Sequence, residues 1–313
     1  MHIGLREAAV HRVAGSETES FADVLAVEEP LEIRIGIEVG GKVEHRPVSI
    51  TMRTPGNDHE LAAGFLFTEG ILRSPDQLKE IKHCGRSEPG AAASGSLPVV
   101  DPRPQTNTVR VDLREGIDVD LKKLERHFYT TSSCGVCGKS SIEALSTGAK
   151  QVVSEIQIDA EMVYELPRKL LSAQFAFDKS GGLHASALFD ADGELEIVRE
   201  DVGRHNALDK VIGKKFLDEE VPLNDKILMV SGRASFELVQ KALMAGIPVL
   251  AAVGAPSSLA VELAKEFKMT LIGFVREDRF NIYCGEERIA GQKSLRERVG
   301  CSNAEIKDQG NFS

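Results

Sequence analysis

The segments HASALFDADGELEIVR (184–199) and GRHNALDKVIGKKF (203–216) decide the fold. In the first segment, two apolar runs flank Asp192-Gly193, a dipeptide that is typical of a tight hairpin turn. The predicted strands are therefore 184–189 and 194–199, and the second segment predicts a helix over 206–216. A hairpin that leads into a helix indicates an α/β fold in this part of the chain.

The flanking segments continue the alternation of helices and strands. The predicted helices are 161–173, 236–245 and 259–267, and the predicted strands are 227–231, 248–253 and 270–275. Single helices between successive strands predict a mostly parallel sheet with helices on both faces. The order helix, hairpin, helix, strand, helix, strand is also similar to the cytidine deaminase fold. We therefore expect residues 151–290 to form a cytidine deaminase-like α/β/α domain.

The first half of the chain predicts a smaller α+β domain over residues 21–150. Its predicted strands are 31–37, 43–52 and 108–113, and its later predicted helices are 121–128 and 140–147. The first two strands are joined by a Gly-Gly turn, which indicates a hairpin. Asn57, with Glu60 three residues later, has the spacing of a capping box and marks the start of another helix. We expect 85–107 to be a long loop and 291–313 to be a polar tail.

Charge and hydropathy exclude several classes of protein. The chain has 313 residues and a formal charge of -10 at pH 7. This charge repels phosphate backbones and anionic membrane surfaces, so neither nucleic acid nor membrane is an expected partner. No apolar run approaches the ~20 residues of a membrane span, and residues 1–20 lack the apolar stretch of a signal peptide. We therefore expect a cytoplasmic protein whose five cysteines are thiols.

Two cysteines, Cys134 and Cys137, lie in the small polar segment TTSSCGVCGKSS (130–141). A cysteine is nucleophilic as the thiolate, which exposure and a nearby positive charge or helix start favour. This segment has glycines, Lys139 and a predicted helix start, so it predicts an exposed loop with a reactive thiol. A thioredoxin-like redox pair fits less well, because such a pair directly follows a strand and opens a helix.

A structural zinc site is the other interpretation of this cysteine pair. Zinc takes about four protein ligands, and the sequence holds no second CxxC and no closely spaced histidine pair. Cys84, His83 or His127 would have to join the site through the fold. Two ligands are half of a site, so we expect no metal, and zinc stays an alternative. Cys284 is interpreted as a packed small side chain, and Cys301 as part of the polar tail.

Two helix starts in the second half predict an anion pocket. In cytidine deaminases the corresponding helix starts hold zinc through H-x-E and P-C-x-x-C motifs. Here GRHNALDKV (203–211) has Asn206-Ala207 where the glutamate is expected, and SGRASFELVQKAL (231–243) has no cysteine. The metal site is thus predicted to be lost, and helix N-termini with arginines remain, which suit phosphate or pyrophosphate. The candidate residues are Arg204, His205, Asn206, Ser231, Arg233 and Ser235.

Two questions stay open at this pocket. Arg204 and Arg233 are alternatively surface charges, or pair with Glu200 and Asp201. His184 is a further catalytic candidate, although a histidine at the start of a strand is more often a structural residue.

Five segments together resemble the formate dehydrogenase accessory sulfurtransferase family. They are RTPGNDHELAAGFLFTEGIL (53–72), TTSSCGVCGKSSIEAL (130–145), EDVGRHNALDK (200–210), SGRASFELVQKA (231–242) and FVREDRFNIY (274–283). The similarity runs from about residue 32 to residue 289. It leaves the N-terminal extension and the polar tail without a family pattern.

The resemblance implies a sulfur carrier. Such a protein receives sulfane sulfur from a cysteine desulfurase and transfers it to the molybdenum cofactor, in its bis-molybdopterin guanine dinucleotide form, before that cofactor enters formate dehydrogenase. The family pattern places the persulfide on Cys134, with Cys137 assisting or resolving it. It also maps cofactor binding to a segment that would extend the basic mouth of the pocket: Phe274, Val275, Arg276, Glu277, Asp278 and Arg279.

The same resemblance implies that the cofactor is a bound substrate, and the paired helix starts at 204–206 and 233–235 predict that GDP binds as its mimic. Two other function classes stay open. A nucleotide hydrolase of the deaminase type would hold stoichiometric zinc, and a cofactor chaperone would bind the molybdenum cofactor with an inert cysteine pair. The sequence does not identify the partner desulfurase or dehydrogenase, and it leaves a homodimer open.

Overall fold

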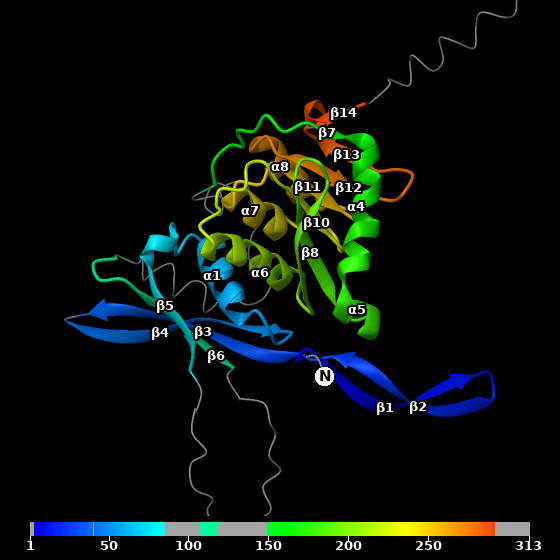
Figure 1. The fold of residues 1–313 in the computed structure, drawn as a ribbon, viewed down its shortest axis with the longest axis horizontal. Coiled ribbons are helices and arrows are strands. Elements are labelled where there is room, and N and C mark those ends of the chain that lie inside the picture. Colours follow the sequence, from blue (N-terminus) through cyan, green and yellow to red (C-terminus); the bar gives the residue numbers. More distant parts are fainter. Residues whose placement is uncertain (1–2, 40, 85–106, 118–148, 292–313) are drawn as a thin grey trace, which may run out of the picture.

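The structure, a computed structural model, describes residues 3–39, 41–84, 107–117 and 149–291 (Figure 1). Several predicted features lie outside these residues: the segment 130–141 with Cys134 and Cys137, the helices 121–128 and 140–147, most of the loop 85–107, and the tail after 291. The described residues form two larger sheets with helices packed between and around them, and a separate β-hairpin.

A six-stranded sheet forms the centre of the second half of the chain. In spatial order its strands are β13 (Asn281–Cys284), β12 (Thr270–Gly273), β11 (Val249–Ala252), β10 (Ile227–Val230), β8 (His184–Phe189) and β9 (Leu195–Asp201). Strands β10, β11 and β12 are parallel, whereas β8 pairs antiparallel with both β9 and β10, and β13 pairs antiparallel with β12. The predicted strands are present, but the sheet is mixed rather than mostly parallel. The physical reason is that the helix after β9 crosses over β8 to reach β10, a long-range placement that local sequence patterns do not specify.

Helices cover both faces of this sheet, as predicted. They are α4 (Ala160–Ala173), α6 (Arg204–Leu217), α7 (Phe236–Met244) and α8 (Ser258–Glu266). The short helix α5 (Phe175–Ser180) follows α4 and packs against residues 17–26. Val163, Leu166 and Leu170 of α4 share one hydrophobic core with one face of the sheet. The apolar side chains of α6, α7 and α8 share a second core with the opposite face.

A four-stranded sheet belongs to the first half of the chain. Its spatial order is β4 (Lys42–Arg53), β3 (Glu29–Val39), β6 (Thr108–Leu113) and β5 (Leu78–His83). This arrangement confirms the predicted hairpin and the predicted strand over 108–113, whereas β5 was not predicted. Helix α1 (Asp58–Thr68) packs between this sheet and α6.

Helices α1 and α6 touch backbone to backbone. A Cβ at Gly64 would lie 1.9 Å from the Asp209 carbonyl oxygen, and a Cβ at Gly213 would lie 1.8 Å from the Glu60 carbonyl oxygen. Only glycine therefore fits at these two positions. Because the helices approach so closely, one hydrophobic core continues from the four-stranded sheet through α1 and α6 to the six-stranded sheet. The division into domains at residue 150 stays a prediction.

The start of α1 uses a different device from the predicted capping box. Asn57 is the N-cap residue, but its φ is 58° and its side chain caps none of the described N–H groups. Asparagine tolerates this left-handed conformation better than most residues. The helix thus begins where the sequence predicted, through backbone conformation rather than through a side-chain hydrogen bond.

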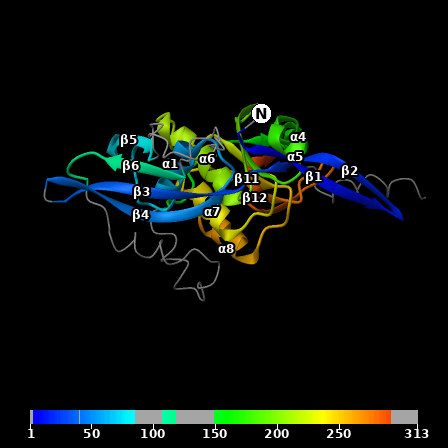
Figure 2. The ribbon, with the colours of Figure 1, turned by 90° about the horizontal axis from the view of Figure 1, so that it is seen from below.

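A hairpin of β1 (Leu5–Ala14) and β2 (Glu17–Ala26) projects from one end of the molecule (Figure 2). No element was predicted before residue 31. The remaining elements are short: β7 (Ile158–Asp159), β14 (Ile289–Ala290) and the 3-10 helices Pro75–Gln77 and Glu286–Arg288. None of the helices in the described ranges is long and apolar enough to cross a membrane.

Candidate functional site

The predicted pocket residues lie along one edge of the six-stranded sheet. The carboxyl ends of β10, β11 and β12 meet at this edge because the strands are parallel. Strand β8 is antiparallel to β10, so it begins at this edge with His184, and β9 ends there with Asp201. The loops 231–235 and 253–257 and the segment 274–279 follow the three parallel strands. Residues far apart in the sequence thus converge at the edge where α/β sheets commonly bind ligands.

Backbone hydrogen bonds join these three segments in order. The Gly254 N–H donates to the Gly232 carbonyl oxygen over 2.9 Å, and the Phe274 N–H donates to the Gly254 carbonyl oxygen over 3.1 Å. A Cβ on Gly254 would lie only 2.9 Å from the Gly232 oxygen, so the first two loops are in direct contact. Arg233 and the segment 274–279 are therefore held in a fixed relation to each other.

Arg204 is the first residue of α6 and has no carboxylate partner within the described ranges. Its Nε is buried and makes no hydrogen bond there. The alternative pairing does not form, because Glu200 accepts two backbone N–H groups at the start of α5, at 2.7 and 2.8 Å, and Asp201 lies 2.7 Å from Lys210 Nζ. Among the described residues, no side chain caps α6, and its first turn has no acidic residue. A partly buried guanidinium beside unsatisfied helix N–H groups favours an anion.

His205, the second residue of α6, contacts the start of α7. Its Nε2 lies 3.3 Å from Ser235 Oγ and 3.4 Å from Glu237 Oε2. The hydrogen bond with His205 lowers the pKa of Glu237 to about 2, so this carboxylate is ionised at neutral pH. An ionised carboxylate only accepts hydrogen bonds, so Nε2 carries a hydrogen when it bonds Glu237. Ser235 stands at the N-cap of α7 but caps none of the described N–H groups, and its hydroxyl instead belongs to this cluster.

His184 completes the cluster. Burial lowers its pKa, and the charges of Arg204 and His205 lower it further, against the opposing effect of Asp201. Gly232 borders the ring, because a Cβ there would lie 3.4 Å from His184 Nδ1. His184 is therefore a neutral imidazole at neutral pH, with one nitrogen that donates and one that accepts a hydrogen bond.

Asn206 and Ser231 hold the framework of the site. The buried amide of Asn206 donates to the Met52 carbonyl oxygen over 2.7 Å and accepts from Thr51 Oγ1 over 3.0 Å. Ser231 Oγ accepts a backbone N–H of β8 over 2.9 Å. Asn206 thus ties β4 to the start of α6, and it positions the neighbouring Arg204 through the backbone.

The segment 274–279 forms the far part of the edge. Phe274 is 40% exposed and has a φ of 54°, an uncommon conformation for an aromatic residue. Arg276 Nη1 donates to the carbonyl oxygens of Val253 and Val275 over 2.8 Å each, so this side chain braces the turn. A cavity of about 480 Å³ opens here, lined by Pro167, Val253, Val275, Arg276, Glu277, Asp278 and Arg279.

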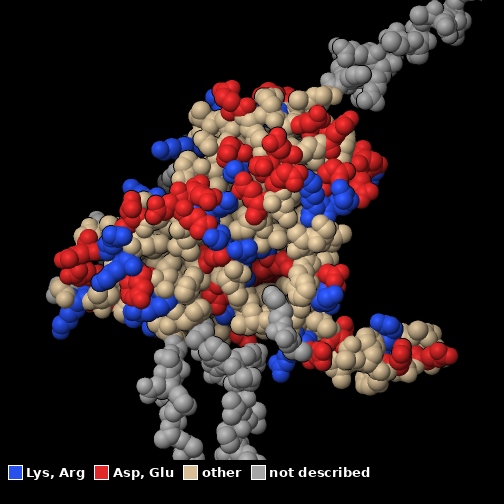
Figure 3. Space-filling view, in the orientation of Figure 1, with Lys and Arg blue, Asp and Glu red and all other residues tan. Residues whose placement is uncertain are grey.

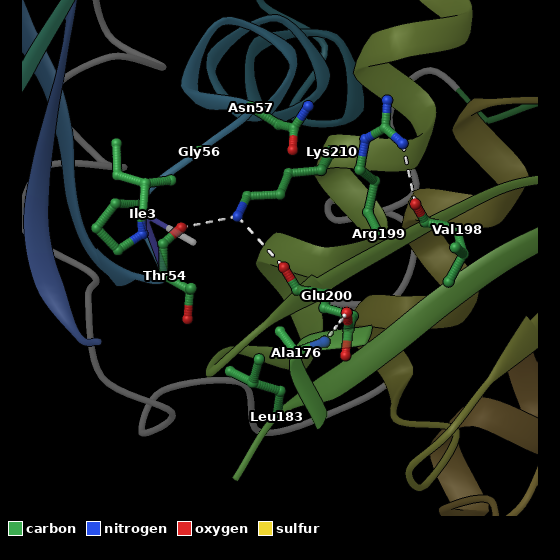
Figure 4. Close-up of a pocket in the computed structure, with 11 residues that line it drawn as sticks. Ile3, Thr54, Gly56, Asn57, Ala176, Leu183, Val198, Arg199, Glu200 and Lys210 are labelled. Atoms are coloured by element: carbon green, nitrogen blue, oxygen red, sulfur yellow. Dashed lines mark hydrogen bonds between the residues drawn. The ribbon is translucent and has the colours of Figure 1, made fainter. Parts of the chain in front are cut away.

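Figure 4 shows a second cavity, of about 240 Å³, where the loop 54–57 meets β9. Lys210 Nζ donates to the carbonyl oxygens of Thr54 and Glu200, over 2.9 and 3.4 Å, and pairs with the buried carboxylate of Asp201. The buried ammonium is thus surrounded by acceptors. This region connects the two halves of the chain, because Lys210 bonds the Thr54 carbonyl oxygen. Its residues were not among the predicted site residues.

Comparison with known proteins agrees with this fold and these motifs. The FdhD/NarQ family matches residues 26–290. The chain belongs to this family. It is 49% identical over 286 residues to the sulfur carrier protein FdhD of Streptomyces avermitilis, with 90% of this chain and 94% of that protein covered. It is 40% identical over 278 residues to the sulfur carrier protein FdhD of Saccharolobus solfataricus, with 89% and 95% covered.

A solved structure supports the same architecture for this FdhD/NarQ chain. The crystal structure of a proposed formate dehydrogenase accessory protein from Desulfotalea psychrophila aligns with a TM-score of 0.66. The alignment covers 91% of this chain and 99% of that chain at 22% sequence identity. At this identity the likeness concerns the fold.

Four of the five motif segments of this FdhD/NarQ chain lie in the described residues, and they touch in series. The segment 53–72 meets 200–210 through Thr54, whose backbone N–H donates to Asp201 Oδ2 over 3.1 Å. His205 then links 200–210 to α7, and the loop 253–257 links α7's loop to Phe274. The fifth segment, with Cys134 and Cys137, lies outside the described residues.

Glu237 is the site residue that the sequence interpretation missed. It follows Ser235 by two positions in the first turn of α7. An acidic residue there is ordinary for a helix start, so only the contact with His205 distinguishes it. Outside the site, Cys84 is exposed, and Cys284 is half-buried with its pKa raised by burial, as expected for a packed small side chain. Among the described residues, no group of three His, Cys, Asp or Glu side chains has metal-binding geometry.

Proposed function

We propose that this protein is a cytoplasmic sulfur carrier for the maturation of formate dehydrogenase. A cysteine desulfurase loads sulfane sulfur onto Cys134, and the protein transfers it to the bis-molybdopterin guanine dinucleotide form of the molybdenum cofactor before the cofactor enters the dehydrogenase. The observation that carries this proposal is the match to the family over residues 26–290, with relatives named sulfur carrier protein FdhD at 40–49% identity.

The sulfur chemistry in this proposal belongs to Cys134 and Cys137. The carrier persulfide forms when its thiolate attacks the outer sulfur of the desulfurase persulfide, the S–S bond of that persulfide breaks, and the desulfurase cysteine leaves as a thiolate. The carrier therefore needs an accessible cysteine with a lowered pKa. The segment 130–141 supports this role through its small residues, its glycines and Lys139. Cys137, three residues later in the sequence, would assist the transfer or resolve the persulfide.

The cofactor would bind at the edge of the six-stranded sheet. Its pyrophosphates carry negative charge, and Arg204 offers a guanidinium without a described carboxylate partner beside two helix starts whose N–H groups lack side-chain caps. Residues 274–279 would contact another part of the same ligand. We also propose that this half has a cytidine deaminase-like fold in which the zinc site is lost: His205 is retained, but Asn206-Ala207 stands where the glutamate of the motif is expected. GDP serves as a probe of this pocket.

The test of the carrier role is mass spectrometry after incubation with a cysteine desulfurase and cysteine. The wild-type protein is expected to gain one sulfur atom on Cys134, and Cys134→Ser protein is expected to gain none and to fail in activating formate dehydrogenase. Cys84→Ser is the matched control, because Cys84 is an exposed thiol outside the proposed site. Full activation by Cys134→Ser protein would contradict the carrier role. An unmodified Cys134 in a protein that binds the cofactor would indicate a cofactor chaperone.

The test of the pocket is calorimetric titration with GDP. Arg204→Ala is expected to weaken GDP binding by roughly 10- to 100-fold, because a hydrogen bond to a charged group contributes about 1.5–3 kcal/mol. Arg46→Ala removes an exposed arginine on β4 and is expected to leave the affinity unchanged. Equal binding by wild-type and Arg204→Ala protein would place the nucleotide elsewhere.

A further inference from the structure

A buried ion pair joins helices α6 and α7, which lie next to each other in Figure 1. Charged side chains are spread over the face of the molecule in Figure 3, but Asp209 of α6 and Lys241 of α7 lie in the interior, 2% and 5% exposed. Lys241 Nζ donates to Asp209 Oδ1 over 3.0 Å. Neither residue was among the predicted site residues.

The end of α1 completes a cluster around this pair. Lys241 Nζ also donates to Thr68 Oγ1 over 2.9 Å and to Glu69 Oε1 over 3.2 Å, so all three ammonium hydrogens are used. Thr68 Oγ1 in turn donates to Asp209 Oδ1 over 2.9 Å. We name these four residues the buried cluster. It joins three of the five motif segments: 53–72, 200–210 and 231–242.

Stability alone does not account for an ion pair in this place. Burial removes the hydration of both charges, and apolar residues of similar volume are often equally stable. The surroundings of the pair are apolar, because the Phe65 ring centroid lies 5.4 Å from Lys241 Nζ and the apolar side chains of α1, α6 and α7 share one core. Hydrogen bonds add direction to such packing, since they fix the distance and the angle between donor and acceptor.

Helix α7 differs in this respect from its neighbour α8. Both helices have nine residues and follow a serine, but Ser257 caps α8 whereas no side chain of the described residues caps α7. The buried residues of α8 are all apolar: Ala260, Leu263 and Ala264. The buried lysine therefore belongs to the helix that lacks a cap and whose start contacts His205.

The ion pair lies one helical turn beyond the pocket. Asp209 follows His205 by four residues on α6, and Lys241 follows Glu237 by four residues on α7. Residues four apart lie on the same face of a helix, about 6 Å apart along its axis. The helices thus contact each other twice. The contact between His205 and Glu237 is part-exposed and spans 3.4 Å, whereas that between Asp209 and Lys241 is buried and spans 3.0 Å.

We propose that Asp209 and Lys241 are positioning residues of the anion pocket. Their buried ion pair sets the register of α7 against α6 and thereby holds Glu237 against His205. The pair acts through these two residues and does not touch the ligand. The inference rests on the proposed function for the identity of that ligand, but the placement of Glu237 is independent of it.

The test is the double variant Asp209→Ala/Lys241→Met, which removes both charges and keeps an apolar side chain in place of the lysine stem. In this variant no fully buried charge loses its partner, because Thr68 Oγ1 still donates to the Phe65 carbonyl oxygen over 3.2 Å and Glu69 is partly exposed. Each single substitution would leave an unpaired buried charge and destabilise the fold, so the two are made together.

Stability and GDP binding are measured on the same proteins. The midpoint of urea unfolding of the double variant is expected to stay close to that of wild type, because the helices still pack through apolar side chains. GDP binding is expected to weaken by roughly 3- to 30-fold, the range for residues that act on a site without touching its ligand. Lys214→Met/Asp218→Ala is the matched control. It makes the same two substitutions in a solvent-accessible pair at the end of α6 and should change neither quantity.

The ionisation of Glu237 is a measurement that a purely structural pair would leave unchanged. The hydrogen bond with His205 lowers the pKa of Glu237 from its ordinary value of 4.5 to about 2. Its carboxylate should therefore be ionised at about pH 4.5 in wild-type and control protein, as observed by NMR of the side-chain carboxyl carbon. In the folded double variant, loss of the contact should leave this group partly protonated at the same pH.

Three outcomes would overturn the proposal. They are an unchanged GDP affinity in a stable double variant, a fully ionised Glu237 in that variant, and a double variant that is strongly destabilised, since the ion pair would then be a requirement of the fold. Wild-type protein that binds no GDP would contradict the proposed pocket instead. The ionisation of Glu237 is measured without nucleotide, so it decides the positioning role in that case as well.

Discussion

Two neighbouring loops, SGRAS (231–235) and VGAPS (253–257), have the same position between a strand and a helix but make different side-chain contacts. Each follows a buried parallel strand, has glycine at its second position and ends in a serine at the N-cap of a nine-residue helix. They lie side by side, with Ala234 bridged to Pro256. Ser257 accepts the Ala260 N–H over 3.2 Å and caps α8, whereas Ser235 makes no such bond and contacts His205.

The two N-cap serines differ in whether the hydroxyl stabilises a helix or contacts the site. A serine N-cap contributes about 1 kcal/mol to helix stability, so diverting the hydroxyl of Ser235 gives up that stabilisation at α7. The loop that gives it up also carries Arg233 and borders His184, while its neighbour has alanine and proline. The second loop is joined to the first by the hydrogen bond from Gly254 to Gly232 and caps its own helix. The polar side chains of the first loop are therefore available for a ligand.

The largest expected effect comes from forcing the two loops apart. In Gly254→Ala, the new Cβ would lie 2.9 Å from the Gly232 carbonyl oxygen and 3.0 Å from Arg233 Cα. We expect a loss of about 1–3 kcal/mol in the free energy of unfolding, measured in urea, together with weaker GDP binding. Gly182→Ala is the control, because its Cβ would meet nothing closer than 3.8 Å. An unchanged free energy of unfolding in Gly254→Ala would show that the loops 231–235 and 253–257 can move apart at little cost and are not held rigidly together.

A smaller effect should distinguish the two serines. Ser257→Ala removes a working cap and should lower the free energy of unfolding by about 1 kcal/mol, without changing GDP affinity. Ser235→Ala removes no cap, so its stability should stay within about 0.5 kcal/mol of wild type, while GDP affinity changes through His205. Equal losses of stability in the two variants would mean that Ser235 caps α7 in solution.

Local sequence patterns predicted most of the strands and helices around the site. The features that they did not predict depend on contacts between residues far apart in the sequence. The Asp192-Gly193 turn, the helix starts and the buried strands have short-range signals, and they were found within a residue or two. The insertion of β8 between β9 and β10 has none, so the sheet was expected to be mostly parallel. Asn206 was assigned to the pocket from its place at the start of a predicted helix, yet its amide bonds the Met52 carbonyl oxygen, 154 residues away.

The smallest effect concerns His184, which borders the first loop of the pair. The ordinary pKa of histidine is 6.5, and burial, Arg204 and His205 lower that of His184 in the folded protein. Between the lowered pKa and about 6.5, the unfolded chain binds a proton that the folded chain does not. The free energy of unfolding must therefore fall as the pH falls through this window, and the loss is complete below the folded pKa.

His184→Gln should reduce this loss, because glutamine keeps a hydrogen-bonding side chain and does not titrate. Part of the pH dependence should remain in the variant, since burial and His83 also lower the pKa of His59. Urea unfolding of wild-type, His184→Gln and His59→Gln protein at about pH 7.5 and 5.5 would separate the two contributions. Each single variant should lose less stability on acidification than wild type does.

If His184→Gln loses as much as wild type, the imidazole beside Gly232 takes up no extra proton on unfolding, and the neutral form assigned to it is wrong. If His184→Gln loses less than wild type, the loop 231–235 differs from its neighbour in bordering a titratable side chain, His184, that is held uncharged near Arg204. A bound anion at this place would raise the pKa of His184.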